Sequence, residues 1–342
     1  MSLRLRFLLF LPFVVPMGLE AQSSDTIRVC TYNLLQFGAG DVDRVDDLRL
    51  ILNGIRPEVL LLQDVLQSRA DAYGGFSLFR DSVATLLDQP LTPFIAWNDS
   101  TDSQVVIFVD TSALDSVHYF VQILNDLTPR DQISMLLRVK ATGDTIMVMT
   151  GYWKAGDTQE DEDNRTMDAE NAVSNLRFSG IASGYRIFGG SLNVYSADEE
   201  AYQTLLRGDD RFNTFTMLDP LDRPGSWHSN EAFADVHTQS PRAREFGGGA
   251  GGGMSDRFDH ILVSDALVDL VRPETYTAFG NDGNHFNDSI NAMPNVAVSP
   301  GMAQALHDAS DHLPVFVDIV FGLKSSVKDV EQTESLELSL KR

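Results

Sequence analysis

Cysteine is almost absent from this sequence: Cys30 is the only one among 342 residues. A single cysteine cannot form an intrachain disulfide, so a disulfide-stapled scaffold is excluded and the fold must depend on its hydrophobic core. The chain has enough apolar material for such a core, because 43% of its residues are hydrophobic and 22% are charged. These proportions are typical of an ordinary globular protein. We therefore interpret Cys30, within a predicted strand, as a small buried apolar residue.

Positive charge is also scarce. The chain has 26 Lys and Arg against 49 Asp and Glu, which gives a formal net charge of −23. Such a chain is not attracted at long range to a nucleic-acid backbone, because phosphate contacts normally come from lysine and arginine. The charge balance therefore favours a small phosphoester, or a salty exterior, over tight binding of duplex nucleic acid.

The N-terminal apolar run is too short to cross a membrane. Phe7–Leu19 has thirteen residues, whereas a spanning helix needs roughly 18 or more. Arg4 and Arg6 precede this run and Ala21 follows it, which is the basic, hydrophobic and small-residue order of a secretory signal peptide. We therefore predict a signal peptide over residues 1–21, and a secreted or periplasmic mature chain with no stable membrane insertion.

Strand and helix patterns alternate after this segment. Ile27–Leu34 and Glu58–Val65 have the continuous apolar runs of buried strands, and Asp43–Gly54 between them repeats apolar residues at helical spacing. Strand, helix and strand in that order predict a layered α/β architecture. Further strands are predicted over Val105–Val109, Ile133–Val139, Thr145–Thr150, Asp256–Ser264 and Val315–Val320, and further helices over Ala70–Gln89, Arg165–Phe178 and Ala197–Leu206.

Two unusual stretches have ordinary interpretations. Asp157–Asp163 is acidic but lacks the spacing of a calcium loop, so we expect it to lead into a helix capped by Asn164 or Asp163. Gly247–Gly253 follows no strand and precedes no Lys-Ser/Thr pair, which excludes a phosphate-binding glycine loop and indicates a mobile loop. Since no repeat or linker divides the chain, we expect one domain over residues 25–323 and a polar tail over 324–342.

Acids, amides and a histidine stand at the ends of several predicted strands. Asn33, Asp64 and Asp311 offer hard oxygen ligands, which suit one Mg²⁺ or Mn²⁺ ion that keeps several waters. His312 could donate to a phosphoryl oxygen, and Asp259 could hold His312 in one tautomer. The glycine pair in the stretch Tyr185–Ser196 ends another strand and leads to a further amide, Asn193, which could also donate to phosphate.

Each of these residues also has a purely structural interpretation when taken alone. Asn33 could be a turn residue, Asp64 a helix cap and His312 a core histidine with satisfied hydrogen bonds. Their occurrence together at separate strand ends favours a single functional site assembled from distant parts of the chain.

The motifs around these residues resemble those of the endonuclease/exonuclease/phosphatase superfamily, the deoxyribonuclease I-like fold. They are T-Y-N-L-L (31–35), L-L-Q-D-V (61–65), Y-W-K-A-G (152–156), G-S-L-N-V (190–194), S-D-R-F-D-H-I-L (255–262) and S-D-H-L-P-V (310–315). The resemblance implies a four-layer α/β sandwich, two mixed β-sheets packed face to face with helices outside, and a site at one edge of both sheets. It also implies metal-dependent hydrolysis of a phosphodiester or phosphomonoester by an activated water.

The resemblance assigns roles residue by residue. Asn33, Asp64 and Asp311 match metal ligands, although the superfamily usually has glutamate where this chain has Asp64. His312 matches the terminal histidine and Asp259 its carboxylate partner. Two further residues match phosphate contacts: Asn193 the binding amide, and Tyr152 a position where many members have histidine. The implied partner is a phosphoester, either nucleic acid or a small phosphorylated molecule, and we expect a monomer.

Ser191 departs from the family pattern. The superfamily has an aspartate there, which orients or deprotonates the attacking water, and a serine cannot act as that base near neutral pH. Loss of a positioned base commonly costs about 10²–10⁴ in rate. Two functions therefore remain open: an exported phosphoesterase with reduced activity, or a non-catalytic relative that binds a phosphorylated ligand or partner. A lipid-headgroup phosphodiesterase ranks lower, because we find no amphipathic or aromatic membrane-binding stretch.

Overall fold

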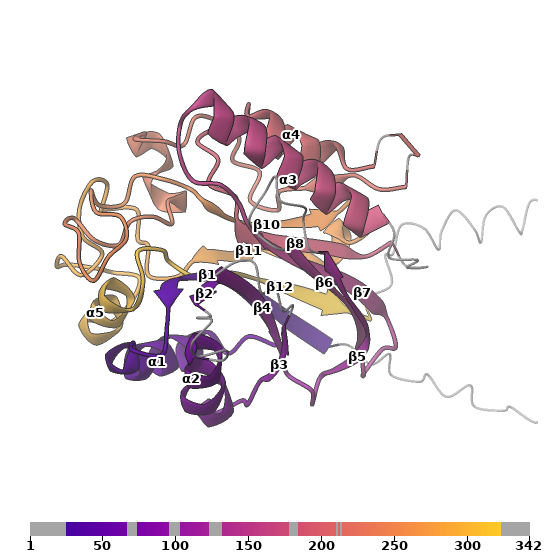
Figure 1. Ribbon diagram of the computed structural model, residues 1–342, viewed down its shortest axis with the longest axis horizontal. Coiled ribbons are helices and arrows are strands. Elements are labelled where there is room, and N and C mark those ends of the chain that lie inside the picture. Colours follow the sequence, from indigo (N-terminus) through magenta and orange to yellow (C-terminus); the bar gives the residue numbers. More distant parts are fainter. Residues whose placement is uncertain are drawn as a thin grey trace, which may run out of the picture.

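The two β-sheets of the chain pack face to face, with helices on the outer face of each (Figure 1). The computed structural model describes residues 25–66, 74–95, 103–122, 132–177, 184–209, 211–212 and 214–322. The predicted signal peptide and polar tail lie outside these residues. The arrangement confirms the four-layer α/β sandwich with two mixed sheets. Among the described residues, no helix has both the length and the apolar character that crossing a bilayer requires.

The first sheet has a parallel pair at its centre. Its strand order is β11 (Val271–Ala278), β12 (Val315–Phe321), β1 (Asp25–Phe37), β2 (Val59–Leu66), β4 (Ser103–Val109) and β3 (Thr92–Ile95). Strands β1 and β2 run parallel, and the other neighbours run antiparallel. Helix α1 (Val45–Ile55) connects the parallel pair, as the strand, helix and strand pattern predicts.

The second sheet repeats this plan. Its order is β5 (Leu114–Gln122), β6 (Gln132–Val139), β7 (Thr145–Tyr152), β8 (Arg186–Ser191), β10 (Asp259–Ser264) and β9 (Met217–Leu218). Strands β7 and β8 form the parallel central pair, joined through α3 (Gln159–Arg177). The carboxyl ends of parallel strands share one edge of a sheet, where α/β proteins usually bind ligands.

Three apolar layers hold the sandwich together. Alternate residues of a strand face opposite sides, so Val29 and Leu61 pack between the sheets while Cys30 and Leu60 pack beneath helices. The first sheet is covered by α1, α2 (Gly74–Ser82) and α5 (Pro300–Ala309), and the second by α3 and α4 (Glu200–Arg207) (Figure 1). Cys30 is fully buried, as the sequence predicts.

Several helix boundaries differ from the sequence prediction. In the predicted helix Ala70–Gln89, the described part is α2 followed by a 3₁₀ turn over Ala84–Leu86. The apolar spacing predicts Val83, Leu86 and Leu87 on one face of this helix. Leu86 is 55% exposed, however, because Phe76 and Phe79 form the buried face together with Val83 and Leu87.

The acidic stretch is part of a helix. Helix α3 begins at Gln159, so the predicted cap at Asn164 or Asp163 is wrong. Acidic side chains stabilise the first turn of a helix through its dipole, and Glu160, Asp161 and Glu162 occupy that turn.

Helix α5 and strand β11 were not predicted from the sequence. Ser299 caps α5 by accepting a hydrogen bond from the Met302 amide, and Pro300 occupies the first turn. Serine followed by proline is a recognisable helix start, so the signal for α5 was present in the sequence.

Glycines at the end of β8 allow two close approaches. A Cβ at Gly190 would lie 2.2 Å from the carbonyl oxygen of Gly151 in the neighbouring strand β7. A Cβ at Gly189 would lie 2.6 Å from Cδ1 of Leu61 in the facing sheet. This glycine pair therefore lets the end of β8 pack closely against strand β7 and against the first sheet.

Replacing Gly190 with alanine should destabilise the protein by about 1–3 kcal/mol or more, because the backbone of β7 must move to admit the methyl group. Urea unfolding followed by circular dichroism measures this change. Gly40→Ala is the matched control, since a Cβ there meets nothing within 4 Å. Equal midpoints for the two variants would contradict the packing argument.

Candidate active site

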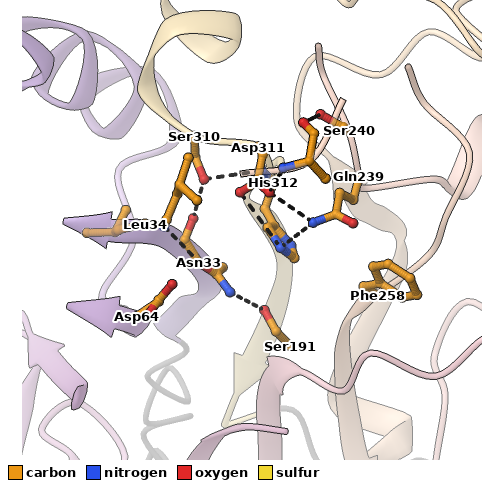
Figure 2. A network of polar contacts seen from close by, with 12 residues as sticks. Asn33, Leu34, Asp64, Ser191, Gln239, Ser240, Phe258, Ser310, Asp311 and His312 are labelled. Carbon is orange, nitrogen blue, oxygen red and sulfur yellow. Dashed lines mark hydrogen bonds and ion pairs between the residues drawn. The ribbon is translucent and has the colours of Figure 1, made fainter. Parts of the chain in front are cut away.

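A pocket of about 300 Å³ lies where the carboxyl ends of the two parallel pairs meet. Six of the eight predicted site residues line it: Asn33, Asp64, Tyr152, Asn193, Asp311 and His312. The other two, Ser191 and Asp259, are fully buried and hydrogen-bonded to residues of this set. The structure therefore brings all eight residues together. Figure 2 shows five of them: Asn33, Asp64, Ser191, Asp311 and His312.

Local backbone distortions turn several of these side chains toward the pocket. The regular pairing of β1 with β2 stops after Asn33 and resumes at Phe37. Leu35, Gln36 and Asp64 all have positive φ values in this interval, at 47°, 49° and 59°. Asn193, just after β8, has a φ of 52°. Such conformations are uncommon for residues other than glycine and concentrate at functional sites.

His312 and Asp259 form a buried ion pair. Nδ1 of His312 lies 2.7 Å from Oδ2 of Asp259, and the side chains are 5% and 0% exposed. The hydroxyl of Thr238 donates to the same carboxylate oxygen at 2.7 Å. Because Nδ1 binds Asp259, Nε2 is the nitrogen that His312 offers to a ligand in the pocket.

The pKa values of this pair shift in opposite directions. Burial alone lowers the pKa of His312, but the carboxylates of Asp259 and Asp311 outweigh it and raise that pKa to about 9. Burial alone raises the pKa of Asp259, but the charge of His312 and hydrogen bonds from His312, Ser191 and Thr238 bring it below its ordinary value. The pair is therefore an imidazolium and a carboxylate near neutral pH.

Ser191 links the two sheets behind the pocket. It lies directly opposite Asp259 in the antiparallel register of β8 and β10, and its hydroxyl donates to Oδ1 of Asp259 at 2.5 Å. The amide nitrogen of Asn33, from the first sheet, donates to the same hydroxyl at 3.2 Å. The serine is fully buried. An aspartate there would place a second carboxylate beside Asp259, where the hydroxyl now donates a proton.

Asp311 has one satisfied oxygen and one that lacks a donor. The backbone amide of Ala250 donates to Oδ2 at 2.7 Å. Oδ1 is buried and meets no hydrogen-bond donor among the described residues; Nε2 of His312 is 4.0 Å away. A buried carboxylate oxygen without a partner is unfavourable, so this atom favours a cation in the pocket.

Asp64 and Asn33 complete the predicted ligand set. Asp64 accepts hydrogen bonds from the Gln36 amide at 2.9 Å and the Ser103 hydroxyl at 2.7 Å, which fix its orientation. No group of three or more His, Cys, Asp or Glu side chains in the described part of the chain could hold a metal ion. The carboxylates of Asp64 and Asp311, the latter with its unsatisfied Oδ1, and the amide oxygen of Asn33 nevertheless fit a hard cation that keeps several of its waters.

Two further side chains offer neutral donors to the pocket. Nδ2 of Asn193 donates to the carbonyl oxygen of Trp153 at 2.8 Å, which leaves its second N–H for a ligand. Tyr152 is half-buried at the end of β7 and lines the pocket. Both residues therefore lie at the pocket, and the phosphate-contact roles that the family resemblance implies for them stay predictions.

Thr238 and Gln239 belong to the site but are not predicted from the sequence. The backbone of Gln239 is bridged to both Asp256 and His312, and its side chain lines the pocket. These residues lie in a segment with no strand or helix pattern, so no periodic signal marked them.

The glycine-rich loop belongs to the site, which the prediction of a mobile loop did not anticipate. Its Ala250 donates to Asp311, and the hydroxyl of Ser240 donates to the Ala250 carbonyl at 2.8 Å. Gly249 has a φ of 79°, and a Cβ there would lie 2.8 Å from Cγ of Asp311. Glycine is needed because the loop backbone lies directly against the carboxylate.

The His312 ring should titrate with a pKa of about 9 in the metal-free protein, measured by NMR, with His312→Gln identifying the resonance. In Asp259→Asn the pKa should fall, since the carboxylate that raises it most, and that carboxylate's hydrogen bond to the ring, are lost. The folded-state pKa exceeds the unfolded value, so the pair stabilises the wild type fully below about pH 6.5, and this stabilisation is lost as pH rises through 9. A wild-type pKa near 6.5 would contradict the ion pair.

The sequence matches no protein-family model and no curated protein. Solved structures nevertheless resemble the chain. An endonuclease/exonuclease/phosphatase family protein from Bacteroides thetaiotaomicron superimposes with a TM-score of 0.55 at 15% identity, covering 88% of this chain and 97% of that one. The human Nocturnin catalytic domain with bound sulfate anion gives 0.52 at 16%, covering 86% and 96%. D. rerio TDP2 complexed with single strand DNA product gives 0.54 at 14%, covering 86% and 98%.

Identities this low establish a common fold and nothing finer. They confirm, at the level of the fold, the resemblance carried by the six sequence motifs. The chain has the α/β sandwich of the endonuclease/exonuclease/phosphatase proteins.

Proposed function

We propose that this protein is a phosphoester hydrolase that depends on Mg²⁺ or Mn²⁺. The observation that carries the proposal is the combination of the buried Asp259–His312 ion pair with the adjacent Asp311, whose Oδ1 has no donor among the described residues. One group offers a positively charged N–H and the other favours a cation, at the same pocket. Phosphoryl transfer needs this kind of electrostatic stabilisation on more than one oxygen.

The side chains of the pocket have separate proposed roles in metal binding and in phosphoryl binding. Asn33, Asp64 and Asp311 would hold the metal ion, which when bound would neutralise phosphoryl charge and lower the pKa of a coordinated water. The imidazolium of His312 donates from Nε2 to a phosphoryl oxygen, and Asp259 keeps the ring charged and oriented. Asn193 and Tyr152 supply neutral donors to the remaining oxygens.

The substrate that we propose is a small phosphoester or a single-stranded nucleic-acid end. The pocket of about 300 Å³ and the net charge of −23 both disfavour a large duplex. Sulfate in the Nocturnin structure and single strand DNA product in the TDP2 structure show that proteins of this fold accommodate oxyanions. Export through the N-terminal segment and a monomeric state are further parts of the proposal.

Ser191 favours a second candidate function. A buried hydroxyl that donates to Asp259 is not available to accept a proton from water. If no other group takes over that role, the site binds a phosphorylated ligand or partner without turning it over. Reduced activity is the expectation for the hydrolase, and no activity is the expectation for the binding protein.

The hydrolase should cleave bis(p-nitrophenyl) phosphate, a short single-stranded oligonucleotide or p-nitrophenyl phosphate when Mg²⁺ or Mn²⁺ is present, and stop when EDTA is added. Asp311→Asn and Asp64→Asn should each lower kcat/KM by about 10² or more, since each removes an anionic ligand. Asp269→Asn, an exposed acid, is the matched control. Metal-independent turnover, or full activity in both site variants, would refute the assignment.

Ser191 variants separate the two functions. Ser191→Ala should lower the hydrolase activity by roughly tenfold, as loss of one hydrogen bond to a charged group predicts. Ser191→Asp restores the base whose loss reduces the rate, so it should raise the activity of a hydrolase that is already active. An inactive wild type that gains metal-dependent turnover through Ser191→Asp would instead establish a binding protein with a repairable catalytic centre.

A further inference from the structure

Gln239 has a rigid backbone and a side chain that reaches into the pocket (Figure 2). Its amide donates to the Asp256 carbonyl at 3.0 Å, and its carbonyl accepts from the amides of Asp256 and Ser255 at 3.0 and 2.8 Å. A second bridge pairs it with His312. The side chain therefore extends from a fixed point, which limits the positions its carboxamide can reach.

The carboxamide contacts both groups on which the proposed function depends. Nε2 of Gln239 lies 2.8 Å from Nε2 of His312 and 3.2 Å from Oδ2 of Asp311. Together with the Ala250 amide, it gives Oδ2 of Asp311 two N–H contacts. Gln239 therefore helps to orient Asp311 so that Oδ1 is the oxygen left for a cation.

A phosphoryl oxygen bound to His312 must also meet Gln239. His312 offers Nε2 to the pocket, and the glutamine nitrogen lies 2.8 Å from that atom. When Nε2 carries a proton, both nitrogens are donors and neither can satisfy the other. A ligand oxygen placed there lies within reach of the same amide. Phosphoryl oxygens accept several hydrogen bonds, so the carboxamide can turn one N–H onto the ligand and keep the other on Asp311.

The charge of the pocket indicates which phosphoester this arrangement suits. Among the described residues that line it, none is lysine or arginine, and two, Asp64 and Asp311, are carboxylates. A neutral carboxamide adds a donor without adding positive charge. The lining therefore matches a singly charged phosphodiester better than a doubly charged phosphomonoester.

Building on the hydrolase assignment, we propose that Gln239 contacts the phosphoryl group and determines specificity for phosphodiesters. Its carboxamide donates to the oxygen held by His312 while it restrains Asp311. The residue would then act in binding and in selection between ester classes, with no role as an acid or base.

Binding of dimethyl phosphate, followed by ³¹P NMR with Mg²⁺ present, tests the contact without requiring turnover. Gln239→Met keeps the side-chain length and removes the donor, so affinity should fall about tenfold, the effect of one lost hydrogen bond. Gln239→Glu replaces the donor with a third carboxylate and should bind more weakly still. Gln159→Met, on the exposed first turn of α3, should bind like the wild type.

Kinetics with bis(p-nitrophenyl) phosphate and p-nitrophenyl phosphate test the selectivity. The ratio of kcat/KM for diester over monoester should fall in Gln239→Met, mainly through a higher KM for the diester, with the thermal midpoint unchanged. If Gln239→Met does not fold, Gln239→Glu carries the same comparison. Unchanged affinity and unchanged ratio in the folded variant would overturn the proposal.

The outcomes also distinguish the two proposals. If the wild type hydrolyses diesters and Gln239→Met has unchanged affinity and KM, the proposed hydrolase function is supported and the proposed role of Gln239 is refuted. If the wild type hydrolyses none of the substrates but binds dimethyl phosphate only when Gln239 is intact, the hydrolase function is refuted and the contact between Gln239 and the phosphoryl group is supported.

Discussion

Asp259 is a fully buried carboxylate, and the site depends on the hydrogen bonds that stabilise its charge. These hydrogen bonds link segments from both sheets. Its hydrogen-bond donors come from three separate parts of the chain: Ser191 in β8, Thr238 before the glycine-rich loop, and His312 before β12. Ser191 in turn is held by Asn33 from the other sheet. Because a buried charge left without its partner costs about 3–5 kcal/mol, folding must bring these segments together, and doing so forms the pocket.

The two sheets contribute to the pocket in the same way. Each has one parallel pair at its centre, joined through a helix on the outer face, and each ends that pair in polar residues: Asn33 and Asp64 in one sheet, Tyr152 and Ser191 in the other. Close packing of the sheets requires small residues at the same edge, which Gly189 and Gly190 provide. Stability and ligand binding therefore depend on the same few strand ends.

The parts of the fold and site whose chemistry or periodicity is local could be predicted from the sequence. Continuous apolar runs located β1 and β2, and the acid-histidine motif with the acid at Asp259 indicated the ion pair that the structure contains. Gln239 could not be predicted, because it lies in an irregular segment and enters the site through pairing with distant residues. The Ala250 contact was also hidden, because a backbone amide has no residue-type signature. Ser191 was read as a missing base, since its hydrogen bond to Asp259 depends on the register of β8 with β10.

The single cysteine, Cys30, can report on local unfolding of strand β1. Burial raises the pKa of the Cys30 thiol, so the reactive thiolate is scarce and the sulfur is closed to reagents while β1 stays paired. Cys30 lies between β12 and β2, three positions before Asn33 on the same strand. Because the sequence has no second thiol, a thiol reagent can label this protein only at Cys30. The labelling rate therefore measures how often β1, the strand that carries Asn33, separates from its neighbouring strands.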